Sequence, residues 1–357
     1  MRVALDTTAL YTTQAGVARY IRGLLRGLAQ AQPNDVDCFE LVWPVENFNY
    51  QQPQRALKTA YRELLWANFI APRELKTSRA DLLHSPVACL VPPPKGMPHV
   101  LSIMDLAFLL HPERFRPWQR LAWKRYLKRV PSVDQILCIS RFTADEVIRI
   151  LGVPARKLHV TYLASDFEGQ SPASAERAPA FEAPSEFFLF VGSLEPGKNL
   201  ALLKRAYLLA AQNGTMLPPL IIVGARWEGV GHEGKPPQGW HYCGRLADAE
   251  LIYLYRRAIA LLFPSKYEGF GLPVLEAMSL GCPVICSPVA SLPEVGGDAV
   301  YYQPLEPEAY LKAMQRLSAD QTFREELISR GQAQAQKFSW KRCAEETVEV
   351  YRMAMHP

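Results

Sequence analysis

The sequence predicts an α/β protein with two doubly wound domains, and three observations support this fold class. Short apolar segments alternate with segments of helical period along nearly the whole chain. Many of the short segments are apolar throughout, as strands covered on both faces of a parallel sheet must be. The length of 357 residues exceeds what one ordinary hydrophobic core holds. Helices between the strands imply right-handed βαβ crossovers and parallel sheets.

Twelve apolar segments are expected to form strands, six in each half of the chain. In the first half they are Val3–Asp6, Phe39–Trp43, Asp81–His84, Val100–Met104, Gln135–Ile139 and Lys157–Leu163. In the second half they are Phe187–Val191, Leu220–Val223, Trp240–Cys243, Ala260–Phe263, Pro283–Cys286 and Ala299–Tyr302. In open parallel sheets ligands bind outside the carboxyl ends of the strands, so the loops at those ends are the places to search for a site.

Composition marks the domain boundaries. Residues 168–185, EGQSPASAERAPAFEAPS, are rich in Pro, Ala and Ser and have no usable period, which predicts a linker. The linker separates an N-terminal domain, 1–167, from a C-terminal domain, 186–338. A second break near Lys337 precedes a last helix over 339–357, for which Ser339 is the expected N-cap.

Composition and charge exclude several classes of protein. The chain is 49% hydrophobic and 21% charged, which indicates a globular protein and not a disordered one. Its apolar runs are too short for a transmembrane helix, and its first residues lack the apolar stretch of a signal peptide. Seven cysteines without a paired spacing suit a reducing compartment, so we expect a cytoplasmic protein. The net charge of +5 allows an anionic ligand or membrane surface without requiring either, and nucleic acid is not an expected partner.

The stretch SKYEGFGLPVLEAMSLGCPV, residues 265–284, places two carboxylates around a Gly-Phe-Gly loop. Leu272 and Pro273 are expected to open a helix there and Gly281 to close it. Glu268 then precedes the helix and Glu276 lies one turn inside it. A carboxylate accepts hydrogen bonds from two neighbouring hydroxyls, as in a ribose diol or a sugar ring. Taken singly, Glu268 could be a solvated loop acid, and Glu276 could balance the helix dipole.

The motif SKYEGFGLPVLEAM resembles the E-x7-E motif of glycosyltransferase family 4, whose members are retaining enzymes with the GT-B fold. The flanking segments GRLADAELIYLYRRA and GCPVICSPVASLPEVGGDAVYY resemble the family as well, and the similarity runs from Phe187 to the C-terminus. It is weaker in ALDTTALYTTQAGVARYIRGLL and VLSIMDLAFLLHPERF. The resemblance implies two Rossmann-like domains facing a central cleft. It also implies that the last helix crosses back to complete the first, acceptor-side domain.

The resemblance implies that the C-terminal domain holds a nucleotide-diphospho-sugar donor. Glu276 would bind the ribose hydroxyls, and Glu268 would contact the donor sugar. Lys198, in VGSLEPGKNLALL, would neutralise the charge that builds on the β-phosphate as the glycosidic bond breaks. Further donor contacts would come from Gly269, Phe270, Gly271, Leu272, Leu246 and Asp248, of which Asp248 is equally expected to be a helix N-cap. Relatives often carry Arg where this chain has Ser193 and Gly197, and Arg245 is a candidate substitute.

In the N-terminal domain, Gly16 would let the backbone approach the diphosphate or the donor sugar. Asp105, which we expect to act in catalysis with Lys198 and Glu268, could bind the acceptor or position a hydroxyl. Relatives commonly carry His where this chain has Met104, and methionine cannot donate a strong hydrogen bond. His84 and His111 are candidate replacements, although each is more easily explained as a packed or capping histidine.

The implied reaction transfers a hexosyl group, with mannose as the first guess, to a glycan or lipid-linked acceptor in cell-surface polysaccharide or lipopolysaccharide synthesis. The nucleotide-sugar is a substrate, and no cofactor and no metal are expected, because no DxD triplet in a metal-site context occurs. Seven basic residues between Arg114 and Arg129 form an amphipathic pattern that suits either the inner membrane face or a solvated helix face. The segment RALKTAYRELLWANFIAPRELK has the same character.

Two other functions stay open at this point. One is an inert GT-B protein that binds nucleotide-sugar as a scaffold or regulator, which Met104 and Ser193 favour. The other is a GT-B epimerase, for which no sequence feature speaks. The donor's sugar and base, the acceptor, the linkage and the oligomeric state are not encoded in recognisable motifs.

Overall fold

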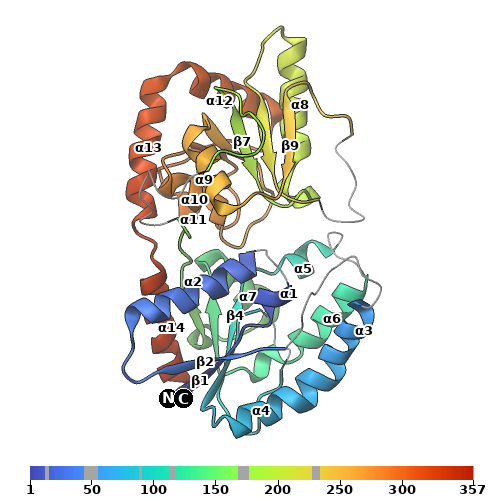
Figure 1. The fold of residues 1–357 in the computed structure, drawn as a ribbon, viewed down its shortest axis with the longest axis vertical. Coiled ribbons are helices and arrows are strands. Elements are labelled where there is room, and N and C mark those ends of the chain that lie inside the picture. Colours follow the sequence, from blue (N-terminus) through green and yellow to red (C-terminus); the bar gives the residue numbers. More distant parts are fainter. Residues whose placement is uncertain are drawn as a thin grey trace. The chain divides into compact units, whose positions relative to one another are not determined.

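The chain folds into two compact units. The computed structural model describes residues 1–12, 16–43, 55–87, 91–112, 117–167, 177–226 and 234–356. One unit comprises Met1–Leu163 with Ser339–Pro357, and the other Ala164–Phe338. Each unit contains a parallel six-stranded sheet with helices packed on it (Figure 1). The predicted α/β fold with two doubly wound sheets is therefore confirmed. Half of the expected linker, residues 168–176, lies outside the described residues.

The first unit has the strand order β2-β1-β3-β4-β5-β6. Its strands are β1 Arg2–Asp6, β2 Asp37–Leu41, β3 Leu82–Ser85, β4 His99–Ile103, β5 Gln135–Cys138 and β6 Leu158–Val160. Its α-helices are α1 Ala9–Thr12, α2 Gly16–Ala31, α3 Arg55–Tyr61, α4 Ala71–Thr77, α5 Ala107–Leu110, α6 Pro117–Leu127, α7 Arg141–Leu151 and α14 Trp340–Met355. A π-helix, η1 Arg62–Ile70, joins α3 to α4, and short 3-10 turns η3 Val130–Ser132 and η4 Ala155–Lys157 precede β5 and β6.

The second unit has the strand order β12-β11-β10-β7-β8-β9. Its strands are β7 Phe188–Val191, β8 Leu220–Val223, β9 Trp240–Gly244, β10 Ala260–Phe263, β11 Val284–Cys286 and β12 Tyr301–Tyr302. Its helices are η5 Pro196–Lys198, α8 Leu200–Gln212, α9 Asp248–Arg257, α10 Leu272–Ser279, α11 Leu292–Gly296, α12 Pro307–Ala319 and α13 Gln321–Ala335. The strands β7, β8 and β10 are fully buried and pack against α8 and α12 in one apolar cluster.

All twelve predicted strands are confirmed, and their limits differ most at the sheet edges. The edge strand β2 ends at Leu41, two residues before the predicted Trp43. Trp43 donates its backbone N–H to the Thr8 hydroxyl, 3.1 Å away, and so leaves the ladder. The other edge strand, β12, is only Tyr301–Tyr302. An edge strand pairs with only one neighbouring strand, so the apolar pattern alone does not determine where its pairing ends.

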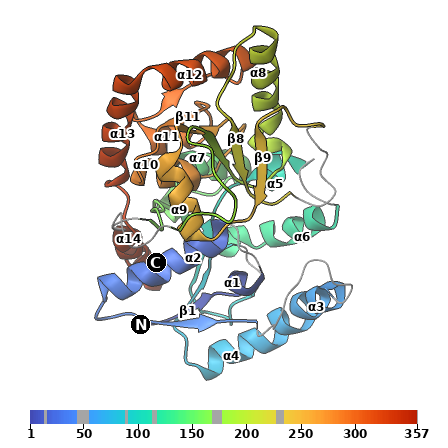
Figure 2. The same cartoon turned by 45° about the horizontal axis from the view of Figure 1, so that its top comes forward.

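The last helix, α14, packs against α2 in the first unit, and the two lie side by side in both views (Figures 1 and 2). Ser339 caps it as predicted, because its hydroxyl accepts the N–H of Arg342 at 3.4 Å. Two glycines of α2 permit the close approach. A Cβ on Gly23 would lie 2.2 Å from the Trp340 ring, and one on Gly27 would lie 2.0 Å from the Trp340 carbonyl oxygen.

Candidate functional site

Three of the predicted donor residues, Lys198, Glu268 and Glu276, follow strands at the point where the strand order of the second unit reverses. From β7 the chain builds outward through β8 and β9, and then returns to place β10 on the other side of β7. In doubly wound sheets, the loops that follow two such neighbouring strands lead away from each other. The space between such loops, at the carboxyl ends of the strands, is the usual ligand position. The loop after β7 carries Lys198, and the loop and helix after β10 carry Glu268 and Glu276.

Lys198 and Glu268 form an ion pair across 70 residues of sequence. Lys198 Nζ donates to Glu268 Oε1 at 2.5 Å, and the two side chains are only 15% and 11% exposed. The ammonium also lies 5.2 Å from the centre of the Phe263 ring. Because water is largely excluded, the pair interacts more strongly than a surface ion pair would. The structure therefore holds one cation in place beside one of the two motif acids.

The loop after β7 is shaped by its own hydrogen bonds. The buried carboxylate of Glu195 accepts the N–H of Gly197 at 2.7 Å, which begins the turn η5. The N–H of Lys266 donates to the Gly197 carbonyl at 2.8 Å and links the loop to the one after β10. Asn199 occupies the N-cap position of α8, but its side chain makes no capping bond. Its backbone adopts a left-handed conformation, φ 56°, which reverses the chain just after Lys198.

Glu276 is only 3% exposed and accepts a hydrogen bond from the Tyr255 hydroxyl at 3.1 Å. Tyr255 lies on α9, and sequence reasoning missed it. Gly271 has φ 103°, and a Cβ there would lie 2.6 Å from Leu292, so only glycine fits before α10. The Phe270 ring is buried against Phe338, with ring centroids 5.8 Å apart.

The helix α10 begins at Leu272, as predicted. Gly281, with φ 74°, follows the last turn, as expected for a glycine that closes a helix. The hydroxyl of Ser291 donates to the carbonyl of Glu268 at 2.9 Å and holds the backbone of the motif loop next to Gly269.

Leu246, Asp248 and Arg245 follow β9, at the edge of the sheet. Adjacent strands are about 4.8 Å apart, so this loop begins roughly 10 Å from the end of β7, a span suited to an extended ligand. The predicted N-cap role of Asp248 is wrong. Ala247 is the N-cap and Asp248 the first helical residue, while the carboxylate of Glu250 accepts the N–H of Ala247 at 2.9 Å.

Glycines with positive φ end three adjacent strands of the second unit, which sequence reasoning also missed. Gly192, Gly224 and Gly244 follow or end β7, β8 and β9. A Cβ on Gly224 would lie 1.8 Å from the Gly192 carbonyl oxygen, so the two turns touch backbone to backbone. For Gly192 and Gly224 the signal was a Val-Gly pair after an apolar run. Glycines at these positions keep side chains off this edge of the sheet.

The first unit carries Gly16 and Asp105 at the carboxyl ends of its strands. Gly16 is the first residue of α2, is exposed, and would have nothing within 4 Å of an added Cβ. Asp105 follows β4, directly after the partly exposed Met104, and its carboxylate accepts the N–H of Ala107 at 2.8 Å. The packing of the described residues does not explain a glycine at 16, and its role in donor binding stays a prediction.

The candidate role of His84 in the reaction is wrong, because the side chain is fully buried within the first unit. Its Nδ1 lies 2.7 Å from the Tyr351 hydroxyl and its Nε2 lies 2.8 Å from the Ser102 hydroxyl. The Tyr20 hydroxyl lies 2.8 Å from the same Ser102 oxygen. The ring therefore links the sheet to α2 and α14. His111 follows α5 and donates its backbone N–H to Ala107 at 2.7 Å.

Two buried histidines make the stability of the fold depend on pH. Burial lowers the pKa of His84 to about 3, and burial lowers the pKa of His99 to about 4. Both protonate near pH 6.5 when the chain unfolds, so the unfolded state binds more protons as pH falls below that value. We expect the free energy of unfolding to drop by about 2 kcal/mol per histidine between pH 8 and pH 5. Urea titrations at both pH values measure this difference.

The matched variants are His84→Gln and His99→Gln, which cannot take up a proton. Each should be less stable at pH 8 and should lose about half of the pH dependence. An unfolding free energy that stays constant between pH 8 and pH 5 in the wild type would contradict the assignment.

Among the residues that the structure describes, no group of three or more His, Cys, Asp or Glu side chains could hold a metal ion. Metal independence of the reaction stays a prediction.

Comparisons with known proteins point in one direction. Residues 15–168 match the family model described as Glycosyltransferase Family 4, and residues 174–334 match the model described as Glycosyl transferases group 1. The chain is 37% identical over 271 residues to O-antigen chain mannosyltransferase B of Escherichia coli, covering 71% of this chain and 70% of that protein.

Two further relatives have less in common with the chain. It is 31% identical over 263 residues to the serotype-specific mannosyltransferase WbdA of E. coli, which covers 69% of this chain but only 32% of WbdA. The chain thus spans about a third of that relative's length. Sucrose-phosphate synthase of Thermosynechococcus elongatus has a similar fold, with a TM-score of 0.71 at 18% identity over 99% of this chain and 98% of that one.

Proposed function

This chain belongs to glycosyltransferase family 4, and from that premise we propose that it transfers a mannosyl group from a nucleotide-diphospho-mannose with retention of anomeric configuration. The acceptor is a glycan or lipid-linked sugar of cell-surface polysaccharide or lipopolysaccharide synthesis. The observation that supports this best is the Lys198 ammonium held by Glu268 at the switch point of the second unit. The similarity to an O-antigen chain mannosyltransferase supports the choice of mannose and of acceptor class.

In the proposed reaction each residue has one task. The carboxylate of Glu276, steadied by Tyr255, receives the ribose diol. Glu268 contacts the donor sugar, and Lys198 stabilises the charge that develops on the leaving diphosphate. The bond between the sugar's anomeric carbon and the phosphate oxygen breaks as the acceptor oxygen bonds to that carbon on the same face. The proton of the acceptor hydroxyl passes to the departing phosphate, so no protein base is required.

Ser193 stands where the family resemblance implies an arginine, so in this proposal Lys198 neutralises more of this charge, with Arg245 as the candidate helper. In the ligand-free protein its charge is balanced by Glu268. When the hydroxyls of the donor sugar hydrogen-bond to the Glu268 carboxylate, that carboxylate interacts less strongly with the Lys198 ammonium. The ammonium then interacts more strongly with the diphosphate. In this proposal Asp105 of the first unit binds the acceptor or positions a hydroxyl, and Gly16 lets the backbone approach the diphosphate or the donor sugar. Neither a cofactor nor a metal takes part.

The protein works in the cytoplasm at the inner membrane face in this proposal, because lipid-linked acceptors are held there. No helix of the described residues is long and apolar enough to cross a bilayer. Association would therefore occur at the surface of the membrane.

A panel of nucleotide-sugars tests the proposal. We expect GDP-mannose at saturating concentration to raise the melting temperature by about 5 °C or more, because ligand at 100 times its Kd adds about 2.7 kcal/mol. UDP-, dTDP- and ADP-sugars serve as the comparison. GDP release, measured with EDTA present, should accompany binding of the right donor.

Two outcomes would contradict this function. If no nucleotide-sugar shifts the melting temperature, the donor site is wrong. If GDP-mannose raises the melting temperature but no GDP is released in the presence of lipid-linked glycans or simple mannosides, the result supports the alternative of an inert nucleotide-sugar-binding scaffold. Glu276→Gln is the matched variant and should lose the shift while keeping the melting temperature of the ligand-free protein.

A further inference from the structure

The helical segment α3–η1–α4 of the first unit has two apolar faces. One face packs onto the sheet through Trp66, Ala67, Ala71 and Leu75, all at most 1% exposed. This face alone accounts for the attachment of the segment to the core. A helix with apolar residues on its outer face as well is normally covered by something else.

The outer face carries six large apolar side chains, here called the apolar ridge. They are Leu57 at 75% exposure, Tyr61 at 45%, Leu64 at 55%, Leu65 at 49%, Phe69 at 68% and Ile70 at 42%. These are half of the twelve exposed large apolar side chains in the described parts of the chain, gathered within fourteen residues. Single exposed apolar residues are ordinary, whereas a contiguous group of them marks an interaction surface.

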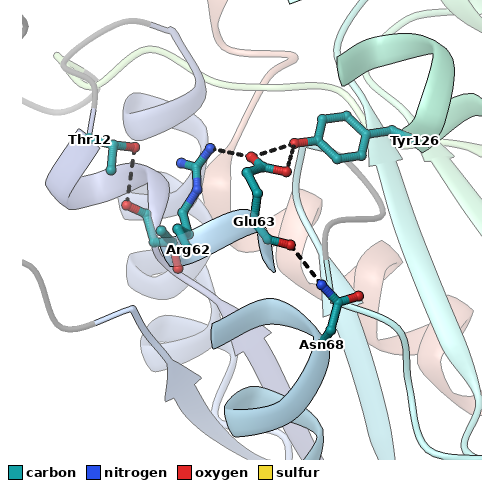
Figure 3. Close-up of polar contacts among 6 residues, drawn as sticks. Thr12, Arg62, Glu63, Asn68 and Tyr126 are labelled. Atoms are coloured by element: carbon teal, nitrogen blue, oxygen red, sulfur yellow. Dashed lines mark hydrogen bonds and ion pairs between the residues drawn. The ribbon is translucent and has the colours of Figure 1, made fainter. Parts of the chain in front are cut away.

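A polar contact joins the π-helix η1, which carries most of the ridge, to the neighbouring helix α6 (Figure 3). The Tyr126 hydroxyl of α6 lies 2.7 Å from each oxygen of the Glu63 carboxylate, which also accepts from Arg62 at 2.6 Å. The side chain of Asn68 donates to the Glu63 carbonyl at 2.7 Å and satisfies the backbone of the π-helix. This contact fixes α6 beside the segment that carries the ridge.

The surroundings of the ridge are strongly basic. Exposed side chains of α4 and α6, here called the basic rim, are Arg73, Lys76, Arg120, Lys124 and Arg125, with Arg79 and Lys128 just beyond the helix ends. Residues 57–79 and 117–129 together contain ten basic and two acidic residues. This excess of eight is larger than the excess of five in the whole chain. One of the two acids, Glu63, is already engaged by Tyr126 and Arg62.

We propose that the apolar ridge and the basic rim dock the protein onto an anionic lipid bilayer, with the ridge entering the interfacial layer and the rim contacting the headgroups. Apolar residues flanked by lysine and arginine are the pattern of interfacial membrane helices. A second copy of the chain fits less well, because pairing the same face would bring two basic rims together. The inference rests on the proposed function for its reason, since a lipid-linked acceptor is reached at a membrane surface.

Vesicle sedimentation of the full chain tests the docking surface. The vesicles are phosphatidylcholine alone, or phosphatidylcholine with phosphatidylglycerol at about three to one. We expect binding to the anionic vesicles to be at least about tenfold tighter than to the neutral ones. The ridge variant Leu65→Gln/Phe69→Gln and the rim variant Arg73→Gln/Lys76→Gln should each weaken it about tenfold or more. The control Leu208→Gln/Met353→Gln changes two exposed apolar residues elsewhere, 45% and 46% exposed, and should bind as the wild type does.

The readouts separate this inference from the proposed function. GDP release from GDP-mannose without vesicles should be equal in the wild type, the ridge variant and the control, and thermal unfolding should show all three folded. If the ridge variant loses vesicle binding and the wild type never releases GDP from GDP-mannose, the docking surface is supported and the proposed function is contradicted. Equal vesicle binding by wild type and ridge variant overturns the surface. A wild-type dimer in light scattering that the ridge variant dissociates, without vesicle binding, overturns it as well.

Discussion

Lys198→Ala is expected to lower kcat by about a hundredfold to a thousandfold, with a much smaller change in donor KM. Removing one preorganised group that stabilises transition-state charge costs about 2.7–4 kcal/mol of transition-state free energy. The expected effect lies in that range because Lys198 is held at 2.5 Å from Glu268, is only 15% exposed, and has no arginine at position 193 to share the load. Initial rates of GDP release over a range of GDP-mannose concentrations measure both constants.

Matched variants make this result specific. Lys266→Ala removes an exposed lysine two residues before Glu268 and should leave kcat within about twofold, because surface charges are screened. Lys198→Arg keeps the charge with different geometry and should recover part of the loss. Glu268→Gln removes the carboxylate that pairs with the Lys198 ammonium in the ligand-free protein. It should also raise the donor KM, because in the proposed reaction this carboxylate contacts the donor sugar. A Lys198→Ala enzyme with kcat within threefold of the wild type would exclude the assigned role.

The fold and the grouping of Lys198 with Glu268 could be predicted because both depend on local sequence. Continuous apolar runs identify strands of parallel sheets, and residues that follow such runs gather at one edge. Lys198 and Glu268 were assigned from their loops and from the family resemblance of the motifs there, and the structure brings the two side chains into contact. Tyr255 could not be found this way, because its role depends on a contact with Glu276 on a different helix.

What the sequence left open or mispredicted has a common physical cause. The explanation of His84 as a packed histidine is confirmed, but its burial depends on α14, which is encoded more than 250 residues later. Asp248 is an ordinary N-cap residue by type, but the helix begins one residue earlier because Glu250 satisfies the Ala247 N–H. The apolar ridge was predicted as part of a basic amphipathic segment. Its exposure became visible only when the structure showed that the sheet covers one face.

Gly27→Ala is expected to lower the free energy of unfolding by about 3 kcal/mol or more, although alanine in a helix interior normally adds up to about 1 kcal/mol. The new Cβ would lie 2.0 Å from the Trp340 carbonyl oxygen, a backbone atom that cannot rotate away. Relief requires moving α14, which carries the buried Tyr351 hydroxyl that contacts His84. Urea unfolding followed by circular dichroism measures the change. A variant as stable as the wild type would contradict this packing.

Gly23→Ala provides the discriminating comparison, because the obstacle there is a side chain. Its Cβ would lie 2.2 Å from the Trp340 ring, and a smaller side chain at position 340 would leave that space empty. Trp340→Leu should therefore recover part of the stability lost in Gly23→Ala, whereas it should recover none of the loss in Gly27→Ala, since every residue at 340 keeps its carbonyl oxygen. The two double-mutant cycles thus separate ring contact from backbone contact at one position. Equal rescue of both glycine variants would mean that α14 shifts as a whole, and that its distance from α2 is not set by these two glycines.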